Sequence, residues 1–422
     1  GAPNIGFTVK HMKINTIEQA EARLKKYVPN VSKFTGDNMS LKRMWPLLEL
    51  FGNPHDKIKT IHIAGTSGKT STAYYVSRML TESGKKTGLT VSPHVYSITE
   101  RIQINAKPIS EADFTNYLER FLFKLEQTDL DPSYFELLIV FSLWVFTQEN
   151  VEYTVLETGM GGLLDGTNVV TRGDKICAIT DIGFDHMHIL GNTLDAIATQ
   201  KAGIIHQDND VFMFKQSREV MKPIYERVEK VGAQLHSIEA PTNTTEGSLP
   251  EFQMRNVFLA DEICNFVAKR DSFTIERISP IDVTIPGRME TRTLRDGTTL
   301  ILDGAHNEQK IQVFTTSFMK KYDSQKATIL LSLKEGKEYK EVVRLLKPIT
   351  NSMIITTFDT SQDLPAKAQD PHLISNYCTE LGINNIVLEN NKIATETLIE
   401  STNPIKLIIG SFYLIGQVDR YI

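Results

Sequence analysis

The sequence predicts an α/β protein whose parallel sheets are covered by helices on both faces. Short apolar segments alternate with helical segments along most of the 422 residues, a pattern typical of strand–helix–strand units. A glycine-punctuated turn joins the first of these strands to the first following helix. A second series of strands begins after a Pro-Gly break at 286–287. We therefore predict a larger domain over 13–287 and a smaller α/β domain over 288–422.

Hydrophobic periodicity predicts the elements of the larger domain. A helical pattern covers about 14–50, and a buried helix is expected near 135–146, an apolar run interrupted by Glu136 and Ser142. Segments predicted to contain strands are 60–64, 86–94, 152–162, 175–186 and 208–216. The helices between and after them are predicted over 71–80, 194–202, 218–231 and 256–270, with a loop at 239–250.

The smaller domain repeats the alternation of strand and helix. Its strands are predicted within 298–307, 326–333, 351–358, 383–389 and 405–411. In parallel sheets, ligands bind beyond the carboxyl ends of the strands. We therefore expect the polar clusters that follow these strands to form the functional site.

Composition excludes several classes of protein. Hydrophobic residues make up 41% and charged residues 23%, unlike a disordered chain, a collagen or a coiled coil. The formal net charge of −5 does not support nucleic-acid binding, which favours a basic excess. The longest apolar run is shorter than the roughly 20 residues that span a bilayer, so no membrane association is expected.

Cysteine usage and the N-terminus indicate the compartment. Cys177, Cys264 and Cys378 lie far apart without a CxxC pair, which argues against a zinc site and a disulfide framework. A reducing compartment fits this pattern, and we expect the cytoplasm. Residues 1–12 are predicted to be a leader outside the fold, and they show no secretory signal.

The turn after the first strand predicts a nucleotide site. Glycines allow successive backbone N–H groups to point inward, and the following helix start adds partial positive charge. The lysine of such a loop reaches the β- and γ-phosphates, and the next hydroxyl binds Mg²⁺. Ile63 occupies the first glycine position of the usual pattern, and an ordinary glycine turn is the alternative. The predicted nucleotide-binding residues here are Gly65, Thr66, Ser67, Gly68, Lys69, Thr70 and Ser71.

Other strand ends carry candidate metal ligands and catalytic groups. Glu157 follows an apolar strand and offers the oxygen ligand that a hard cation prefers, although it could instead cap a turn. Asp185 and His186 follow another strand, and His186 is a plausible second ligand or a structural histidine. Composition alone suggests that Lys201 is a surface lysine and that the loop containing Ser92-Pro93-His94 is solvent-exposed.

Taken together, these motifs resemble the Mur ligase superfamily, and within it the folylpolyglutamate synthase / dihydrofolate synthase family. The resemblance covers nearly the whole chain after Met12. It is carried by GTSGKT at 65–70, VSPHVYSITERIQIN at 91–105, LETGMGGLLDGTNVV at 156–170, TDIGFDHMHILGNTLDAIATQKAGII at 180–205, IPGRME at 285–290, LDGAHN at 302–307 and GSFYLIGQV at 410–418.

The resemblance implies a phosphate-loop ATPase domain followed by a smaller Rossmann-like domain, and it assigns roles. Lys69 holds phosphates, Thr70 or Ser71 and Glu157 hold one Mg²⁺, and His186 holds a second. Lys201 matches a lysine that the family carbamylates. Nucleotide contacts are implied for Asn256, Arg288, Asp303 and His306. Contacts to the folate and glutamate are implied for Ser92, Pro93, His94, Arg101, Gly161 and Asp165. Asp185, His186, Lys69 and Lys201 form the implied catalytic set.

The implied activity is an ATP-dependent amide ligase that adds L-glutamate to a folate-type carboxylate through an acyl phosphate. Its partners are ATP, glutamate and a pteroate or folate, and a monomer is expected. The sequence departs from the family pattern at Thr70, Leu163, Gly166, Glu308 and the segment 334–339. These departures bear on which acid the enzyme accepts as its substrate. Two alternatives are a ligase for a peptidoglycan precursor and a nucleotide-binding homologue without ligase chemistry.

Overall fold

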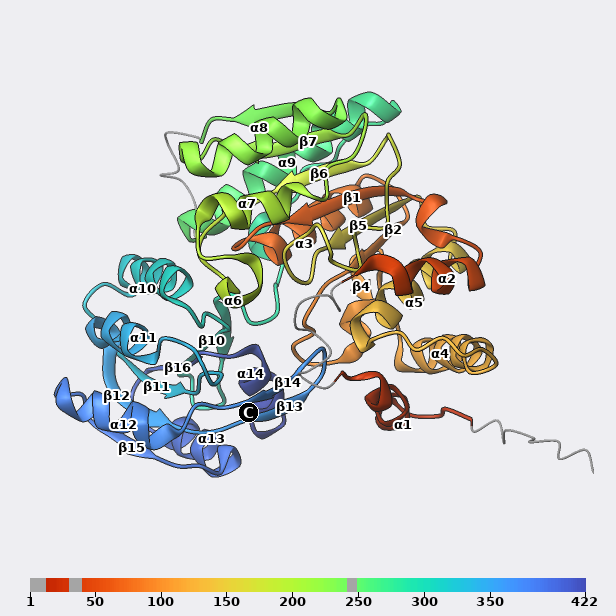
Figure 1. Ribbon diagram of the computed structural model, residues 1–422. Coiled ribbons are helices and arrows are strands. Elements are labelled where there is room, and N and C mark those ends of the chain that lie inside the picture. The colour runs from red at the N-terminus through yellow and green to blue at the C-terminus, as the bar shows by residue number, and fades with distance from the viewer. Residues whose placement is uncertain (1–12, 30–39, 241–248) are drawn as a thin grey trace, which may run out of the picture.

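Two sheets divide the molecule into two lobes, which Figure 1 shows one above the other. The computed structural model describes residues 13–29, 40–240 and 249–422. We call the part up to Gly287 the first lobe and the part from Arg288 the second lobe. The predicted leader, residues 30–39 of the first helical pattern and most of the predicted loop at 239–250 lie outside the described residues.

The first lobe is built on an eight-stranded sheet in the order β4-β3-β2-β5-β1-β6-β7-β8. Neighbouring strands from β2 to β8 are parallel, whereas β3 and β4 join antiparallel at one edge. The predicted parallel α/β class is confirmed. The strands are β1 (Lys59–Ala64), β2 (Thr87–Thr90), β3 (Gln103–Ile104), β4 (Lys107–Pro108), β5 (Tyr153–Glu157), β6 (Ile176–Ile179), β7 (Asp210–Phe214) and β8 (Gln234–Ile238).

Helices cover both faces because side chains alternate along each strand. On one face, Ile61 and Ile63 pack against α3 (Lys69–Glu82) and α9 (Glu251–Asp271). On the other, Cys177 and Ile179 pack against α7 (Leu194–Ala202) and α8 (Arg218–Val231). Leu156 on β5 belongs to a third cluster, which includes α1 (Ile17–Leu24), α2 (Met44–Leu50), α4 (Glu111–Leu125) and α5 (Tyr134–Gln148).

The predicted apolar helix is confirmed as a core element. Most side chains of α5 are buried, and its N-terminus is a capping box in which Ser133 and Glu136 exchange hydrogen bonds with backbone N–H groups. Across the described ranges, no helix combines the length and apolar character needed to cross a membrane.

The second lobe has a six-stranded sheet in the order β15-β12-β11-β16-β10-β9, of which only β9 is antiparallel. Its strands are β9 (Glu290–Thr293), β10 (Thr299–Asp303), β11 (Ala327–Leu331), β12 (Thr350–Ile355), β15 (Asn385–Val387) and β16 (Ile405–Ile409). Its helices are α10 (Glu308–Tyr322), α11 (Tyr339–Leu346), α12 (Pro371–Glu380), α13 (Asn391–Glu400) and α14 (Phe412–Val418). A separate hairpin, β13 (Asp359–Ser361) and β14 (Pro365–Lys367), extends from this lobe.

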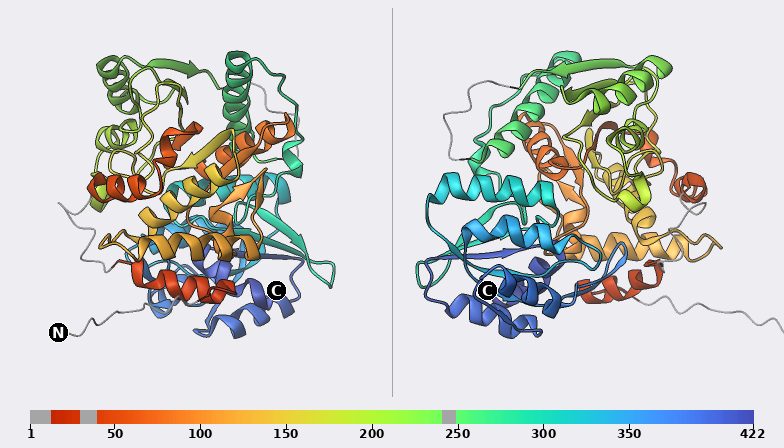
Figure 2. Two further views of the ribbon diagram at one scale, coloured as in Figure 1. Left: turned by 90° about the vertical axis from the view of Figure 1, so that its right-hand side faces the viewer. Right: turned by 60° about the vertical axis from the view of Figure 1, so that its left-hand side comes forward.

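The lobes meet along one side of the first sheet (Figure 2). Tyr96 of the first lobe donates a hydrogen bond to Glu290 of the second at 2.5 Å. The short helix α6 (Met187–Leu190) and the loop before it reach from the first lobe toward α10, as Figure 1 shows. The carboxyl ends of β1, β5 and β6 therefore face the second lobe.

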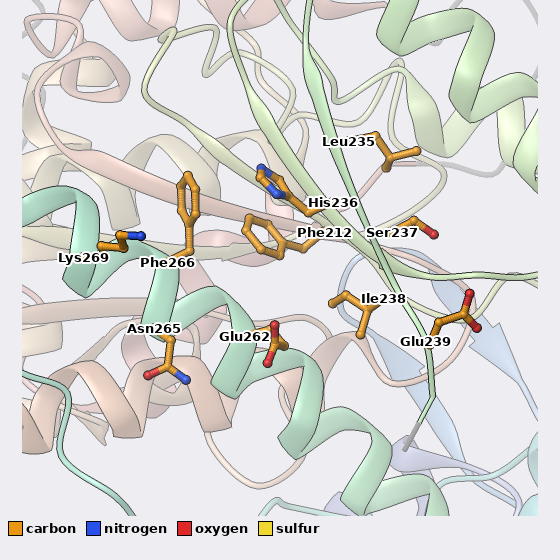
Figure 3. Close-up of a pocket in the computed structure, with 10 residues that line it drawn as sticks. All are labelled: Phe212, Leu235, His236, Ser237, Ile238, Glu239, Glu262, Asn265, Phe266 and Lys269. Atoms are coloured by element: carbon orange, nitrogen blue, oxygen red, sulfur yellow. The ribbon is translucent and has the colours of Figure 1, made fainter. Parts of the chain in front are cut away.

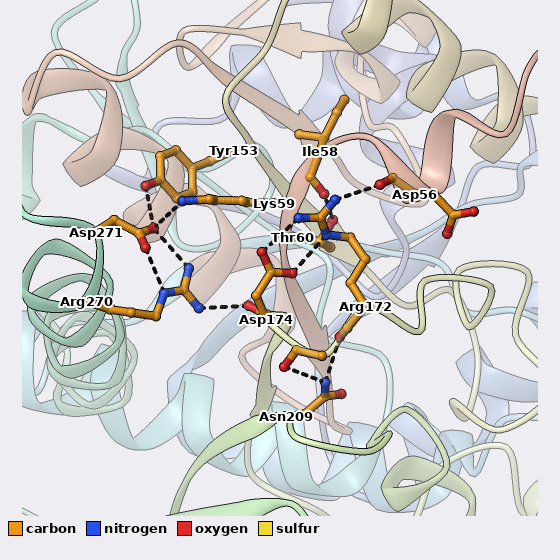
Figure 4. A network of polar contacts seen from close by, with 11 residues as sticks. Asp56, Ile58, Lys59, Thr60, Tyr153, Arg172, Asp174, Asn209, Arg270 and Asp271 are labelled. Carbon is orange, nitrogen blue, oxygen red and sulfur yellow. Dashed lines mark hydrogen bonds and ion pairs between the residues drawn. The ribbon is translucent and has the colours of Figure 1, made fainter.

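The opposite, amino-terminal edge of the first sheet is tied by a polar network (Figure 4). Asp271, the last residue of α9, accepts hydrogen bonds from Tyr153 at 2.6 Å and Arg270 at 2.9 Å, and it pairs with Lys59 at 3.2 Å. Arg270 also donates to the backbone carbonyl of Asp174 at 2.7 Å. The network fixes the end of α9 to the starts of β1 and β5.

We expect Asp271→Ala to destabilise the fold without affecting nucleotide binding. The change removes an acceptor from the buried Tyr153, the partly buried Arg270 and the more exposed Lys59, which costs about 1–3 kcal/mol of unfolding free energy. Thermal unfolding followed by circular dichroism measures the loss, and ADP titration serves as the control because the network lies at the edge away from the candidate site. A marked loss of ADP affinity would contradict this separation.

Candidate active site

The phosphate loop, residues 65–70, lies between β1 and α3 as the sequence predicts. Gly68 caps α3 at a φ of +86°, and a Cβ there would stand 2.4 Å from the side-chain oxygen of Asn256. Only glycine allows this close approach without strain. Lys69 donates a hydrogen bond from Nζ to the Gly65 carbonyl at 3.0 Å. The structure thus brings Asn256 of α9 to the loop.

Glu157 and the phosphate loop meet at the hydroxyl of Thr70. Thr70 donates to Glu157 Oε1 at 2.6 Å, and the hydroxyl accepts a hydrogen bond from Arg288 of the second lobe at 2.8 Å. The backbone N–H of Ser92 donates to the other Glu157 oxygen at 3.2 Å. Arg288 lies over the ring of Phe412 at 4.1 Å. Thr70, Glu157 and Arg288, which belong to three separate predicted motifs, therefore meet at the Thr70 hydroxyl.

Lys201 is buried beside the same loop, with 3% of its surface exposed. Its Nζ donates to the Gly65 carbonyl at 2.8 Å. Burial, together with the nearby charge of Lys69, lowers the pKa of Lys201 to about 7. The composition-based expectation of a surface lysine is wrong, because α7 is pressed against the glycine loop: a Cβ at Gly162 would lie 2.8 Å from the Gln200 carbonyl.

Asp185 and His186 form a charged corner between the lobes. Asp185 lies 3.6 Å from His186, 3.9 Å from Lys310 and 4.0 Å from Lys337. Burial opposes ionisation of Asp185, but Lys310 and the other cations outweigh it and hold its pKa well below the usual range. Burial lowers the pKa of His186 to about 4, so its ring is neutral at pH 7 and keeps a lone pair for a ligand.

Asp303 and His306 lie at the end of β10 in the second lobe. Asp303 accepts hydrogen bonds from the backbone N–H groups of Met289 at 2.7 Å and Ala305 at 2.8 Å. Burial raises the pKa of this carboxyl group to about 6. His306 Nδ1 contacts the Gly304 carbonyl at 2.7 Å. Asp303 therefore holds the backbone next to Arg288 and next to His306, with both of its oxygens engaged.

The loop containing Ser92, Pro93 and His94 is held at the interface between the lobes. His94 is 5% exposed, so the expectation of a solvent loop is wrong at this residue. Its Nδ1 accepts a hydrogen bond from Arg101 Nε at 3.0 Å. Arg101 is 2% exposed and donates two further bonds, at 3.0 and 2.7 Å, to Asp363 in the turn of the β13–β14 hairpin. Arg101 and its counter-ion thus belong to different lobes.

Asp165 closes the glycine loop that follows Glu157. One carboxylate oxygen accepts from the backbone of Gly159 and Met160, at 3.0 and 2.8 Å, and the other accepts from the N–H and hydroxyl of Thr167. Gly161 has a φ of +67° within this loop. The carboxylate faces its own loop, which it holds next to β5 and α7.

Several residues at the site were not predicted from the sequence. The Asp181 carbonyl accepts from the N–H groups of Thr66 and Ser67, at 2.9 and 3.1 Å, and its carboxylate is paired with Arg255. Lys310 and Lys337 come from the second lobe. Asp181 could have been identified from its position, because it follows the strand β6 and precedes Asp185-His186. Lys310 lies three residues after the LDGAHN motif. Lys337 lies in the segment 334–339, which departs from the family pattern.

The donor set fits Mg²⁺ bound together with phosphates. Among the residues that the structure describes, no group of three or more His, Cys, Asp and Glu side chains forms a complete metal cage. Thr70 and Glu157 instead present two adjoining hard oxygens. Mg²⁺ is commonly held by one or two protein ligands while water and substrate phosphates complete its shell.

A depression of about 700 Å³ lies between β8 and α9, away from the phosphate loop (Figure 3). Its wall includes Phe212, stacked on His236 with 4.5 Å between the ring centroids, and Phe266. None of the residues predicted for the site lines it. The convergence at the phosphate loop therefore remains the candidate active site.

Family models match most of the chain. The Mur ligase middle domain matches residues 63–289, and the C-terminal domain of dihydrofolate synthetase matches residues 288–421. The dihydrofolate synthase/folylpolyglutamate synthase of Bacillus subtilis is 28% identical over 421 residues, covering 91% of this chain and 95% of that protein. The dihydrofolate synthetase of Saccharomyces cerevisiae is 29% identical over 419 residues, covering 90% and 97%.

Solved structures agree with this assignment. The folylpolyglutamate synthase of Mycobacterium tuberculosis, solved with ADP, superimposes with a TM-score of 0.79 at 25% identity, over 96% of this chain and 97% of that one. The same enzyme with ADP and AMPPCP gives a TM-score of 0.78 over 96% and 98%. The chain is therefore a Mur ligase and belongs, within that superfamily, to the folylpolyglutamate synthase / dihydrofolate synthase family.

Proposed function

We propose that this protein is an ATP-dependent ligase that joins L-glutamate to the carboxylate of a pteroate or folate. The observation that carries the proposal is the meeting of Thr70, Glu157 and Arg288 at one hydroxyl, beside the phosphate-loop Lys69. The Glu157 carboxylate and the Arg288 guanidinium lie beside the phosphate loop. This arrangement supports a site in which a triphosphate meets a second anion. Such charge placement is the main requirement of phosphoryl transfer.

In the first step, the acid substrate's carboxylate attacks the γ-phosphorus of ATP. The bond to the β-γ bridging oxygen breaks, which releases ADP and leaves an acyl phosphate. Lys69 and Arg288 neutralise charge on the phosphate oxygens in this step. Phosphorylation is needed because a free carboxylate is a poor electrophile.

In the second step, the amino nitrogen of glutamate attacks the acyl carbon. The tetrahedral intermediate expels inorganic phosphate, the nitrogen loses a proton, and an amide forms. The acyl phosphate must be protected from water until the amine arrives. The contacts of Arg288 and Tyr96 across the lobes support this exclusion, because they close the second lobe over the carboxyl ends of β1 and β5.

Thr70 and Glu157 would hold one Mg²⁺, with Ser71 as the alternative hydroxyl, and His186 would help to hold a second. Bound Mg²⁺ would supply charge neutralisation between the two anions. We also propose that Lys201 is carbamylated: its neutral amine adds to CO₂, a C–N bond forms, and a proton is lost. Its burial and its pKa of about 7 support this, because a protonated amine cannot react.

The identity of the acid substrate is tested with a panel of acceptors. Phosphate release is measured with ATP, Mg²⁺ and L-glutamate plus dihydropteroate, tetrahydrofolate or a UDP-muramoyl acid. We expect release with one or both of the pterin acids and none with the UDP-muramoyl acid. Release that depends on the latter would favour a peptidoglycan ligase, and release without any acceptor would favour a simple ATPase.

We also propose that the protein is a monomer in the cytoplasm and that its two domains are residues 13–287 and 288–422. The three cysteines are free and buried, which suits a reducing compartment. Light scattering coupled to size-exclusion chromatography tests the monomer.

A further inference from the structure

Lys310 reaches the candidate active site from the second lobe. It is in the first turn of α10, and its Nζ lies 3.9 Å from Asp185 of the first lobe. The neighbouring Gln309 packs on Gly183, where an added Cβ would stand 2.0 Å from the Gln309 side-chain oxygen. The first turn of α10 is therefore seated on the loop before α6, as the ribbon in Figure 1 also shows.

The surroundings of Lys310 contain more positive than negative charge. Lys69 and Lys201 donate to the same Gly65 carbonyl, and Lys337 lies 4.0 Å from Asp185. Burial lowers the pKa of Lys310 to about 8, and Lys69, Lys337 and Arg288 add to this effect while Asp185 opposes it. The three ammonium groups of Lys69, Lys310 and Lys337, gathered near one aspartate, are unfavourable unless an anion of several charges joins them.

We propose that Lys310 contacts the terminal phosphate of bound ATP from the closing lobe. The backbone of a phosphate loop and the start of its helix hold the inner phosphates, and the loop lysine reaches outward. Lys310 approaches the loop lysine from the opposite lobe, so it faces the outer end of the triphosphate. The inference deepens the proposed function and rests on it for the identity of the nucleotide.

This position resembles in principle the arginine that a partner supplies to nucleotide-hydrolysing enzymes. Arg288 contacts Thr70 of the phosphate loop, whereas Lys310 pairs with Asp185 of the loop before α6. A cation on the second lobe would contact the γ-phosphate of ATP but would lose that contact with ADP. Lys310 would therefore discriminate between the two nucleotides.

Calorimetric titration with Mg²⁺-ADP and Mg²⁺-AMPPNP tests the proposal in the full chain. For Lys310→Met we expect AMPPNP affinity to fall by about tenfold or more, the usual range for a lost charged contact, and ADP affinity to change less than about twofold. Lys310→Arg should restore most of the AMPPNP affinity. Lys320→Met, on an exposed part of the same helix, is the matched control and should bind both nucleotides as the unmodified protein does.

An equal loss for both nucleotides would overturn the proposal in favour of a structural role, and no loss for either would show that Lys310 does not touch the phosphate. Should Lys310→Met not fold, as judged by circular dichroism, Lys310→Gln replaces it with the same criteria. The titration needs neither acid substrate nor glutamate, so its outcome is separate from that of the acceptor panel.

Discussion

Replacing Glu157 by Gln is expected to abolish Mg²⁺-dependent ADP formation. Glu157 is 2% exposed, and its two oxygens accept hydrogen bonds from Thr70 and from the Ser92 backbone. The amide keeps the shape and one acceptor but removes the charge that attracts the cation. We expect turnover to fall by about 10²–10³-fold or more, the range seen when a preorganised electrostatic group is removed.

The measurement is ADP release at saturating ATP, acid and glutamate, with thermal unfolding to show that the variant folds. Glu152→Gln is a matched control, because Glu152 is exposed and immediately precedes the same strand. A Glu157→Gln protein that retained more than about a tenth of the activity would remove the carboxylate from the mechanism.

Replacing Lys201 by Ala is expected to abolish turnover to a similar extent. The lysine is buried against the Gly65 carbonyl, so its loss removes the proposed carbamate and the contact with the phosphate loop. With a pKa of about 7, the neutral fraction of this amine rises as pH increases through 7. At constant dissolved CO₂, carbamate loading of the unmodified protein should therefore increase from about pH 6 to 8.

Two measurements check the role of Lys201. Enzyme freed of CO₂ should regain activity on addition of bicarbonate, and ¹³C-labelled bicarbonate should give a carbamate resonance that Lys201→Ala lacks. The exposed Lys215→Ala, after β7, is a matched control that should keep both properties. Full turnover of Lys201→Ala at ordinary bicarbonate concentration would show that no carbamate is needed.

Much of the fold could be predicted because its central strands are apolar runs between clear turns. The helices predicted at 194–202 and 218–231 match α7 and α8. The helix α4 was missed, as was the separate β13–β14 hairpin, and four further missed strands lie at or next to sheet edges, where polar sequences have no period-2 apolar signal. β9 reads Glu-Thr-Arg-Thr, β8 contains Gln234 and His236, and β3 and β4 have two residues each. Pairing with a neighbouring strand, rather than local sequence, defines these strands.

The site could be predicted where one motif supplies both the residue and its surroundings. Glu157 and the phosphate loop each follow an apolar strand, and adjacent strands place them together. Lys201 could not be recognised as buried from its own helix, since the glycine loop some 40 residues earlier covers it. Asp363 and Lys310 approach from the second lobe, and no local pattern records which distant segment will face them.

The pairing of Arg101 with Asp363 has a consequence for how substrates enter. Parting the lobes would strand a guanidinium in a low-dielectric wall, because the nearby Glu100 carboxylate already serves three backbone N–H groups. Water or the carboxylate of an incoming organic acid must then replace Asp363 as the partner of Arg101. Without substrate, the protein should therefore favour the arrangement in which the two lobes are in contact. An anionic substrate that pairs with Arg101 should lower the free energy needed to separate them.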